Sequence, residues 1–265
     1  MYQFTYHRPE NLGEAVALLQ TVEEPKLLAG GHTLLPTMKQ RLASPANLID
    51  LNKVPGLAGI ELEGSELVIG AMTRHADVAQ SALVQAAIPA LADLAGGIGD
   101  PAVRHRGTIG GSIANNDPAA DYPAACLALD ATIVTDRRSL PAEAFFIGLF
   151  ETALEEGEII TQVRFPKPSK AAYAKFRNPA SRYAIVGVFA AERAGDVRVS
   201  VTGAGSEGVF RVTSFEDALK GDFSSKALEG LAVDPGNLNS DIHADAAYRA
   251  HLINVMARRA VAAAR

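Results

Sequence analysis

The stretch GTIGGSIANNDPAADYPA at residues 107–124 restricts the fold most, and LAGGHTLLP at residues 28–36 carries a shorter version of the same pattern. Leu28-Ala29 precede the Gly-Gly pair of one stretch and Thr108-Ile109 that of the other, and a hydroxyl side chain follows each pair within two positions. Successive glycines let backbone N–H groups converge, because no Cβ obstructs them, and the resulting concavity suits phosphate oxygens. A helix expected after the first pair adds the positive end of its dipole. Two such turns could hold a diphosphate from opposite sides.

The spacing of these glycines matches neither GxGxxG nor GxxxxGK[ST], which argues against a Rossmann fold and a P-loop. A single Gly-Gly pair between a strand and a helix is more often an ordinary tight turn. This chain has two such pairs, and Asp117 and Asp121 follow the second one. A dinucleotide-binding site and two ordinary structural turns are therefore about equally well supported interpretations. Arg104, His105 and Arg106 could steer an anionic cofactor, face an acidic partner or form a solvated cluster.

Length and composition exclude several classes of protein. The 265 residues suffice for a sizeable core. The chain has 25 Lys and Arg and 30 Asp and Glu, so it lacks the excess of positive charge that nucleic-acid binding needs. Cys126 is the single cysteine and the six histidines have no paired ligand spacing, so we expect no metal or cluster in this chain. No GxSxG or HExxH motif appears, and we assign no catalytic residue.

The first ten residues lack a basic region followed by an apolar one, and the longest uncharged stretch, residues 78–92, is interrupted by polar residues and a proline. We therefore expect a cytoplasmic protein without a membrane span.

Hydrophobic periodicity predicts an α+β protein. Asn11 is the expected N-cap of a first helix, with Glu14 three residues later, and Gly64-Ser65 and Ala194-Gly195 have the composition of hairpin turns. Pro166 and Pro168 mark a linker, since proline restricts its own backbone and that of the preceding residue. We expect strands over residues 26–29, 47–51, 59–63, 66–71, 127–135, 159–165, 171–176, 183–192 and 196–202, and helices after Asn11 and over 34–42, 73–96, 215–220, 224–231 and 244–264.

The two glycine stretches resemble the diphosphate-binding motifs of the FAD-binding medium subunits of molybdenum hydroxylases, the family of carbon monoxide dehydrogenase, xanthine dehydrogenase and aldehyde oxidase. The likeness covers almost the whole chain, from FxYHRP through NLIDL and VIGAMT to EEGEIITQVRFP and the helical tail. It implies an FAD-binding module of the vanillyl-alcohol-oxidase-like (PCMH) type. Two subdomains, residues 1–55 and 56–166, would hold FAD between them. A C-terminal α+β domain, residues 169–265, with a three-stranded antiparallel sheet and helices, would cover it.

The residues that the resemblance assigns to FAD lie in the two glycine stretches and at five single positions. They are Leu28, Ala29, Gly30, Gly31, His32, Thr33, Leu34, Ile98, Thr108, Ile109, Gly110, Gly111, Ser112, Asp121, Ile160, Lys175 and Tyr183. The family usually ends its second motif in Asn, whereas this chain has Ser112, which offers fewer hydrogen bonds to phosphate.

The five single positions have distinct implied roles. By resemblance, Asp121 takes cofactor hydroxyls, Ile98 lies against the isoalloxazine ring, and the main chain of Ile160 reaches the polar edge of the ring. Lys175 would stabilise the reduced, anionic flavin, and Tyr183 would lie over the ring. Each residue also has a purely structural alternative. Asp121 could cap the following helix, and Ile98 and Ile160 could be core residues. Lys175 could be a surface lysine, and Tyr183 could be a half-buried aromatic residue of a strand.

The resemblance implies an oxidoreductase subunit that does no substrate chemistry of its own. A large molybdenum-cofactor subunit would oxidise the substrate, and a small subunit would relay electrons through two [2Fe–2S] clusters. FAD in this chain would pass them to an external acceptor, in a dimer of heterotrimers. Two alternatives remain: a self-contained FAD-dependent oxidase, against which the scarcity of aromatics argues, and a flavin-free scaffold subunit, against which the intact glycine pairs argue.

Overall fold

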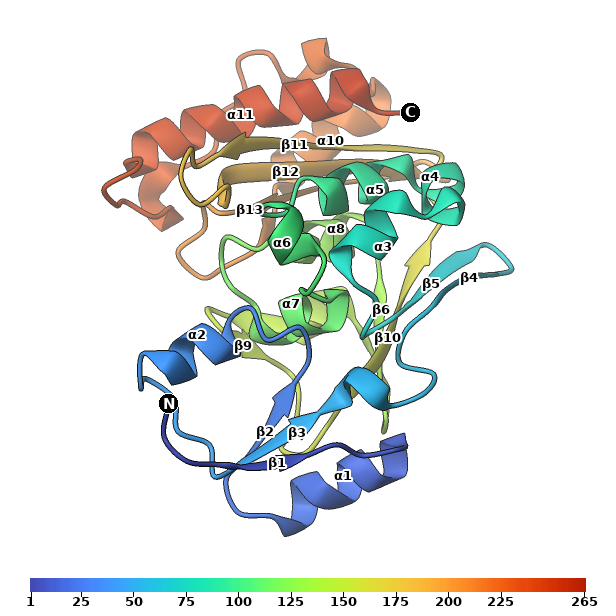
Figure 1. Ribbon diagram of the computed structural model, residues 1–265. Helices are drawn as coiled ribbons and strands as arrows, with labels where there is room; N and C mark the ends of the chain where they lie inside the picture. The colour runs from blue at the N-terminus through green and yellow to red at the C-terminus, as the bar shows by residue number, and fades with distance from the viewer.

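Three β-sheets of at least three strands each follow one another along the chain, with helices between and over them (Figure 1). The computed structural model describes residues 1–265. The sheets lie within residues 5–50, 60–166 and 170–211. This mixture of sheets and helices has the predicted α+β composition. We propose 1–55, 56–166 and 169–265 as the corresponding subdomains.

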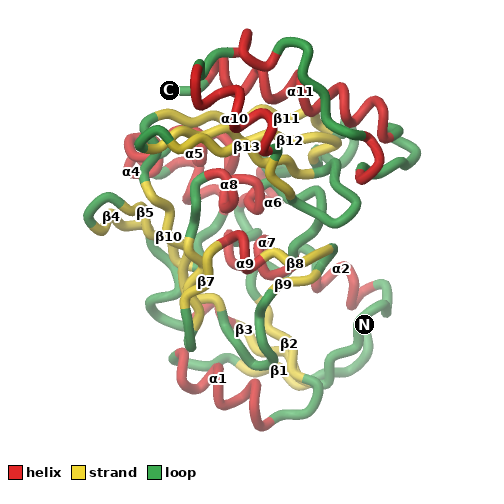
Figure 2. The backbone as a smooth tube through the Cα atoms, turned by 180° about the vertical axis from the view of Figure 1, so that it is seen from behind, coloured by secondary structure: helices red, strands yellow, loops and turns green.

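The first sheet is parallel, with the strand order β1-β3-β2. Helix α1 packs beside it at the end of the molecule opposite α11 (Figure 2). As predicted, the Asn11 side chain caps α1 by accepting from Glu14 N at 2.9 Å, and the Glu14 carboxylate accepts from Glu10 N at 2.7 Å. The elements are β1 Thr5–His7, α1 Leu12–Thr21, β2 Pro25–Leu28, α2 Leu34–Lys39, β3 Asn47–Asp50 and the 3₁₀ turn η1 Leu51–Lys53.

The second sheet is antiparallel, with the order β4-β5-β10-β6-β7. The predicted turn at Gly64-Ser65 joins β4 to β5, with Gly64 at φ +61°. The strands are β4 Ile60–Glu63, β5 Glu66–Gly70, β6 Thr132–Thr135, β7 Ser139–Pro141 and β10 Ile160–Pro166, with a separate hairpin of β8 Phe146–Gly148 and β9 Glu151–Thr152. The helices are α3 His75–Gln80, α4 Ala82–Ala87, α5 Pro89–Gly96, α6 Pro101–Arg104, α7 Ile109–Asn115, α8 Tyr122–Ala128 and α9 Ala142–Phe145.

The strand predicted over residues 127–135 is wrong in its first half. Helix α8 continues to Ala128, the chain turns at Asp130 with φ +55°, and β6 begins only at Thr132. A continuous apolar run has the same appearance in a buried helix and a buried strand, so periodicity could not separate them.

The third sheet contains the three antiparallel strands predicted after the linker, and a two-residue strand at its edge that was not predicted. The helix expected over residues 224–231 is only a 3₁₀ turn, and Gly230 follows it at φ +76°. The elements are β11 Lys170–Arg177, β12 Ala184–Arg193, β13 Asp196–Thr202, β14 Phe210–Arg211, α10 Thr213–Gly221, η2 Ser225–Leu228, η3 Pro235–Asn237 and α11 Ala246–Ala263.

Strand β12 is buried over eight successive residues, because both faces of the third sheet are covered. Helices α10 and α11 lie on one face and α5 and α8 on the other (Figure 1). One core cluster accordingly joins Phe189 and Ala191 to the helices of the second sheet, and another joins Val188 and Ala190 to α11. No helix of the structure combines the length and the apolar character needed to cross a membrane.

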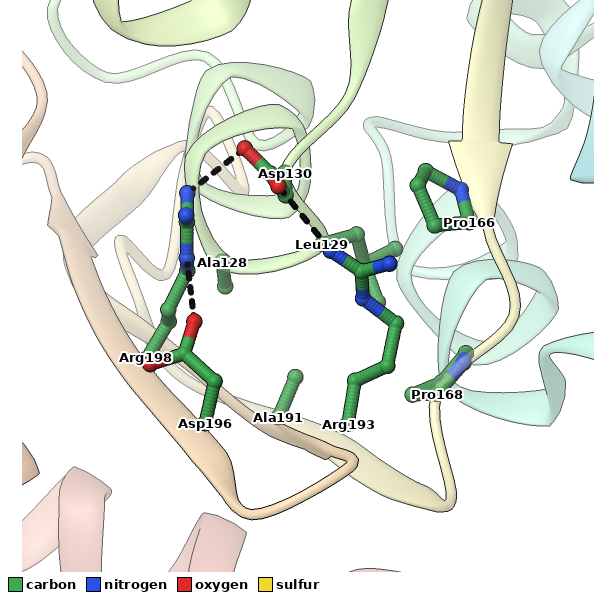
Figure 3. A pocket seen from close by; sticks show the side chains of 9 residues that line it. All are labelled: Ala128, Leu129, Asp130, Pro166, Pro168, Ala191, Arg193, Asp196 and Arg198. Carbon is green, nitrogen blue, oxygen red and sulfur yellow. Dashed lines mark hydrogen bonds and ion pairs between the residues drawn. The ribbon is translucent and has the colours of Figure 1, made fainter.

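A small pocket at the junction of the second and third sheets is lined by residues that form ion pairs (Figure 3). Asp130 accepts from Arg193 Nη2 at 3.0 Å and lies 2.9 Å from Arg198 Nη1. Pro166 and Pro168 of the predicted linker line the same pocket. The ion pairs therefore fasten the end of α8 to the third sheet beside the linker.

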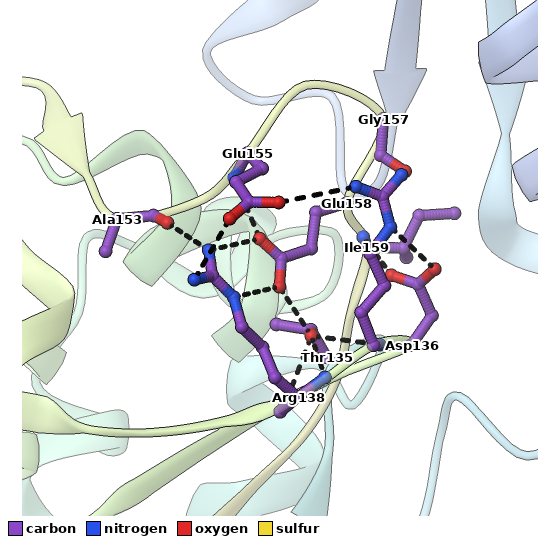
Figure 4. Close-up of polar contacts among 9 residues, drawn as sticks. Thr135, Asp136, Arg138, Ala153, Glu155, Gly157, Glu158 and Ile159 are labelled. Atoms are coloured by element: carbon purple, nitrogen blue, oxygen red, sulfur yellow. Dashed lines mark hydrogen bonds and ion pairs between the residues drawn. The ribbon is translucent and has the colours of Figure 1, made fainter.

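The loop before β10 is fastened to the turn after β6 (Figure 4). The Glu158 side chain has no exposed surface and accepts from Arg138 Nε and Nη2, each at 2.9 Å, and from Thr135 Oγ1 at 2.7 Å. Asp136 accepts from Ile159 N at 2.7 Å. These bonds fix the chain where it enters β10.

Glu158→Gln is expected to lower the unfolding free energy at pH 7 by about 2 kcal/mol, after allowance for water around the partly exposed arginine. The hydrogen bond from Arg138 is the main cause that lowers the pKa of Glu158 from 4.5 to about 2. Because the folded-state pKa is lowered, the stabilisation is present above about pH 5 and is lost as the pH falls towards 2. Urea unfolding of both proteins across this range checks it, and a difference that stays constant down to pH 3 contradicts it.

Candidate functional site

The first glycine segment, residues 29–34, connects β2 to α2 and carries a run of free N–H groups. Gly31 is in the left-handed region at φ +74°. None of the backbone N–H groups from Gly30 to Leu34 donates to an acceptor in the protein. Successive N–H groups around a left-handed residue form a concavity that binds anions. The segment therefore has unpaired donors of the kind that the sequence leads us to expect at a phosphate site.

The second glycine segment, residues 108–112, has a different geometry from the concavity expected. It is the first turn of α7, in which Thr108 is the N-cap and accepts from Gly111 N at 3.1 Å. Gly110 N donates to Ala71 O at 2.8 Å, and Ile109 N donates to Thr73 O at 3.1 Å. These N–H groups are already paired, so the segment contributes the hydroxyl of Ser112, which makes no hydrogen bond within the protein.

Close packing explains the glycine at position 110. A Cβ there would lie 2.6 Å from the Cβ of Ala71 and 2.7 Å from its carbonyl oxygen. The glycine lets the start of α7 approach the chain that leaves β5, and this approach fixes where the second segment lies.

The first glycine segment packs against the second and against the two residues that precede it. A Cβ on Gly30 would overlap the carbonyl oxygen of Arg106 and lie 2.8 Å from the Cα of Gly107. A Cβ on Gly111 would lie 3.4 Å from that of Ala29. Segments about 80 positions apart in the sequence are thus close enough to contact one diphosphate, as the prediction requires.

Positive charge lies beside the first segment. His32 Nε2 is 3.3 Å from Ala102 O, and the Arg104 guanidinium donates to the carbonyls of Ile98 and Gly99 at 2.8 and 3.1 Å. Burial lowers the pKa of His75 to about 4, and the charges of His32 and Arg104 act in the same direction. His105 and Arg106 are exposed, whereas Arg104 is half-buried and its guanidinium is bound to these two carbonyls. Arg104 shapes the loop before the second segment.

A buried ion pair forms the second part of the site. Lys175 Nζ lies 2.9 Å from Asp121 Oδ1 and donates to Gly97 O at 3.0 Å, and the two side chains are 3% and 5% exposed. The Tyr173 hydroxyl donates to the same carboxylate. Burial raises the pKa of Asp121, and the charge of Lys175 acts against this rise.

Strand β11 and helix α8 bring this group together. Alternation along β11 places Tyr173 and Lys175 on the same face, and Asp121 precedes the first turn of α8. A Cβ on Gly187 of β12 would overlap the Tyr173 hydroxyl, so this glycine makes room for the contact. The alternatives of a helix cap and a surface lysine are both wrong, since Asp121 makes no capping hydrogen bond and Lys175 is buried.

Ile98 and Tyr183 lie near this pair, whereas Ile160 lies toward the second glycine segment. Ala71 N donates to Thr161 O at 2.9 Å, and Ala71 O accepts from Gly110 N. Ile98 follows Gly97, the carbonyl of which binds Lys175. Tyr183 is 48% exposed, and the pKa of its hydroxyl is raised by burial and by the charges of Asp117 and Asp121. Ile160 is buried in β10 within the core of the second sheet.

Sequence reasoning missed two residues that support the site. Asn52 contacts the first segment through Ala29 O at 3.1 Å, and Tyr173 holds Asp121. Tyr173 could have been found, because it lies two residues before Lys175 on a predicted strand and so on the same face of the sheet. For Asn52 the sequence offered no signal, because its contact depends on which strands are neighbours.

Comparisons with known proteins agree with this geometry. Residues 2–168 match the family model described as "FAD binding domain in molybdopterin dehydrogenase". The chain is 39% identical to the carbon monoxide dehydrogenase medium chain of Hydrogenophaga pseudoflava, covering 99% of this chain and 97% of that one. It is 36% identical to the nicotine 6-hydroxylase medium subunit of Paenarthrobacter nicotinovorans, covering 97% and 95%.

Solved structures give the same result. The carbon monoxide dehydrogenase of Hydrogenophaga pseudoflava that lacks the Mo-pyranopterin moiety superimposes with a TM-score of 0.88 at 39% identity over 99% of this chain and 97% of that chain. Quinoline 2-oxidoreductase from Pseudomonas putida 86 gives 0.84 at 27% identity over 98% and 96%. The predicted fold type and the predicted FAD cofactor are confirmed.

The residues present fit FAD. The five unpaired N–H groups of residues 30–34 supply donors for a diphosphate. The Ser112 hydroxyl, across the contact between the segments, can supply another.

Proposed function

The chain belongs to the family of FAD binding domains in molybdopterin dehydrogenase and is the FAD-binding medium subunit of a molybdenum hydroxylase; from this premise we propose that it transfers electrons from a [2Fe–2S] subunit to an external acceptor. The substrate would be oxidised on a large molybdenum-cofactor subunit. The proposed assembly is a dimer of heterotrimers in the cytoplasm. This chain would supply the last link of the electron path.

The run of free N–H groups from Gly30 to Leu34, in contact with the second segment, carries the proposal. The backbone there would bind the diphosphate and so orient the rest of the cofactor. Bound FAD supplies a group that accepts electrons singly or in pairs and delivers either one or two. The protein holds that group in place and surrounds it with fixed charges.

Within the Asp121–Lys175 pair, the Lys175 ammonium would supply one of these charges. Lys175 lies in a water-poor environment, with its ammonium held by Asp121 and by Gly97 O. Ile98 follows Gly97, and the hydroxyl of Tyr183 is close enough to Asp121 to be affected by its charge. We propose that both side chains contact the ring system of the flavin. A fixed cation beside the flavin favours its reduced, anionic form.

Purified chain, alone and with its partner subunits, is expected to bind FAD and to show the visible absorbance of a flavin. The substrate of the complex should bleach this absorbance only when all three subunits are present. A colourless protein that takes up no FAD in either preparation contradicts the proposal. Turnover of a reduced substrate by the chain alone would instead indicate a self-contained oxidase.

Gly111→Arg separates this function from that of a flavin-free scaffold. Its long side chain would start beside Ala29, where the two glycine segments meet. We expect the variant complex to assemble without FAD, to reduce its molybdenum and iron–sulfur centres with substrate, and to lose transfer to the acceptor. Undiminished transfer in an FAD-free variant complex would favour the scaffold.

A further inference from the structure

The first glycine segment rests on side chains that follow the neighbouring strand. Strands β2 and β3 are parallel, with Leu28 opposite Asp50, so the residues after both strands meet at one edge of the sheet. There Asn52 Nδ2 donates to Ala29 O at 3.1 Å. The same amide nitrogen donates to Asp50 Oδ1 at 2.6 Å, and Asn52 N donates to that oxygen at 2.9 Å.

Asp50 is itself fixed from the other side. The residue is 9% exposed, and its Oδ2 accepts from the hydroxyl of Tyr6 on β1. Burial acts to raise the pKa of Asp50, but the hydrogen bonds from Tyr6 and Asn52 outweigh it and lower the pKa. The carboxylate is therefore ionised at neutral pH and orients the Asn52 amide strongly. All three strands of the first sheet thus contribute to the contact with Ala29.

Peptide geometry extends this contact to the phosphate-binding groups. The chain has no cis peptide bonds, and in a trans peptide the C=O and the N–H point in opposite directions. Fixing the carbonyl of Ala29 therefore fixes the N–H of Gly30, the first free donor of the segment. Gly30, which has no Cβ, would otherwise leave this peptide more freedom than any other residue at that position would.

We propose that Asn52, oriented by Asp50, is a positioning residue that holds the first glycine segment ready for a diphosphate. This inference rests on the proposed function and adds a residue to its binding site. Asn52 strengthens binding by lowering the cost of ordering the segment. It acts on the diphosphate and leaves the flavin ring unaffected.

The test compares Asn52→Ala and Asn52→Asp with a control, Asn254→Ala. Asn254 Nδ2 also donates to main-chain carbonyls, those of Leu228 and Leu231 at 2.8 and 2.9 Å, but within the third subdomain. Each full-length chain, freed of flavin, is titrated with FAD and with ADP, which carries the diphosphate without the flavin. The reduction potential of bound FAD is measured as well.

Asn52→Ala is expected to raise the Kd for FAD and for ADP by the same factor, about fivefold, with an unchanged flavin potential. Asn52→Asp should raise both further, because a carboxylate cannot donate to Ala29 O and repels the diphosphate. Asn254→Ala should change neither Kd. Wild-type affinity for ADP in Asn52→Ala, or an equal loss in the control, overturns the positioning role while the proposed function stands. If the wild-type chain binds neither FAD nor ADP, the proposed function fails and the positioning role fails with it.

Discussion

Gly30→Ala is expected to raise the Kd for FAD by about 100-fold, the result of overpacking where the two glycine segments touch. The added Cβ would overlap the carbonyl oxygen of Arg106 and lie 2.8 Å from the Cα of Gly107. Both atoms belong to the backbone and cannot rotate away as the end of a side chain can. The segments must separate, and the free N–H groups are then displaced from the second segment. Fluorescence titration of the flavin-free variant with FAD measures the effect.

Gly221→Ala is the matched control for this substitution. Gly221 ends α10, has no atom within 4 Å of an added Cβ, and is not in the left-handed region. The same change in chemistry is therefore expected to leave FAD binding and stability almost unchanged. Wild-type affinity in Gly30→Ala would show that the contact between the segments does not matter for the cofactor.

Lys175→Met is expected to lower the unfolding free energy at pH 7 by about 3 kcal/mol, because it leaves the buried Asp121 without its cation. Burial already raises the pKa of Asp121, and removing Lys175 removes the main effect that opposes this rise. A folded-state pKa above the unfolded value gives stability that is lost as the pH rises. The variant should therefore be relatively more stable at pH 5 than at pH 8, as measured by urea unfolding.

Two further variants isolate the buried pair. Asp121→Asn combined with Lys175→Met removes both charges and should recover most of the lost stability. Lys170→Met removes a partly exposed lysine of the same strand, which lies 2.9 Å from Glu192, and should cost less than about 1 kcal/mol. Equal losses for the two lysine variants, with no dependence on pH, would contradict the account of the pair.

Local sequence signals predicted most of the elements of the fold. Strand β13 occupies the predicted residues 196–202, since the turn before it is built from Ala194 and Gly195, both at positive φ. The helix after Asn11 begins as its capping residues indicate. These elements depend on turn and capping residues next to them in the sequence, so the sequence alone predicts them.

The sequence indicated which segments form the candidate site. Its geometry differs from the prediction where it depends on contacts between residues far apart in the sequence. Both glycine segments were found, but the N–H groups of Ile109 and Gly110 are taken by carbonyls of Thr73 and Ala71, nearly 40 positions earlier. The sequence contains no sign of that pairing. The burial of Lys175 likewise follows from helices that cover the third sheet, and no pattern around the lysine itself indicates it.

The central claim is that backbone N–H groups of the first glycine segment bind the diphosphate of FAD beside the second segment. A crystal structure of the FAD-bound chain tests it most directly, through the distances from diphosphate oxygens to the backbone nitrogens of residues 30–34. The account predicts several distances of about 2.7–3.2 Å, with the Ser112 hydroxyl on the other side of the diphosphate. A diphosphate bound elsewhere, with these N–H groups facing water, would contradict it.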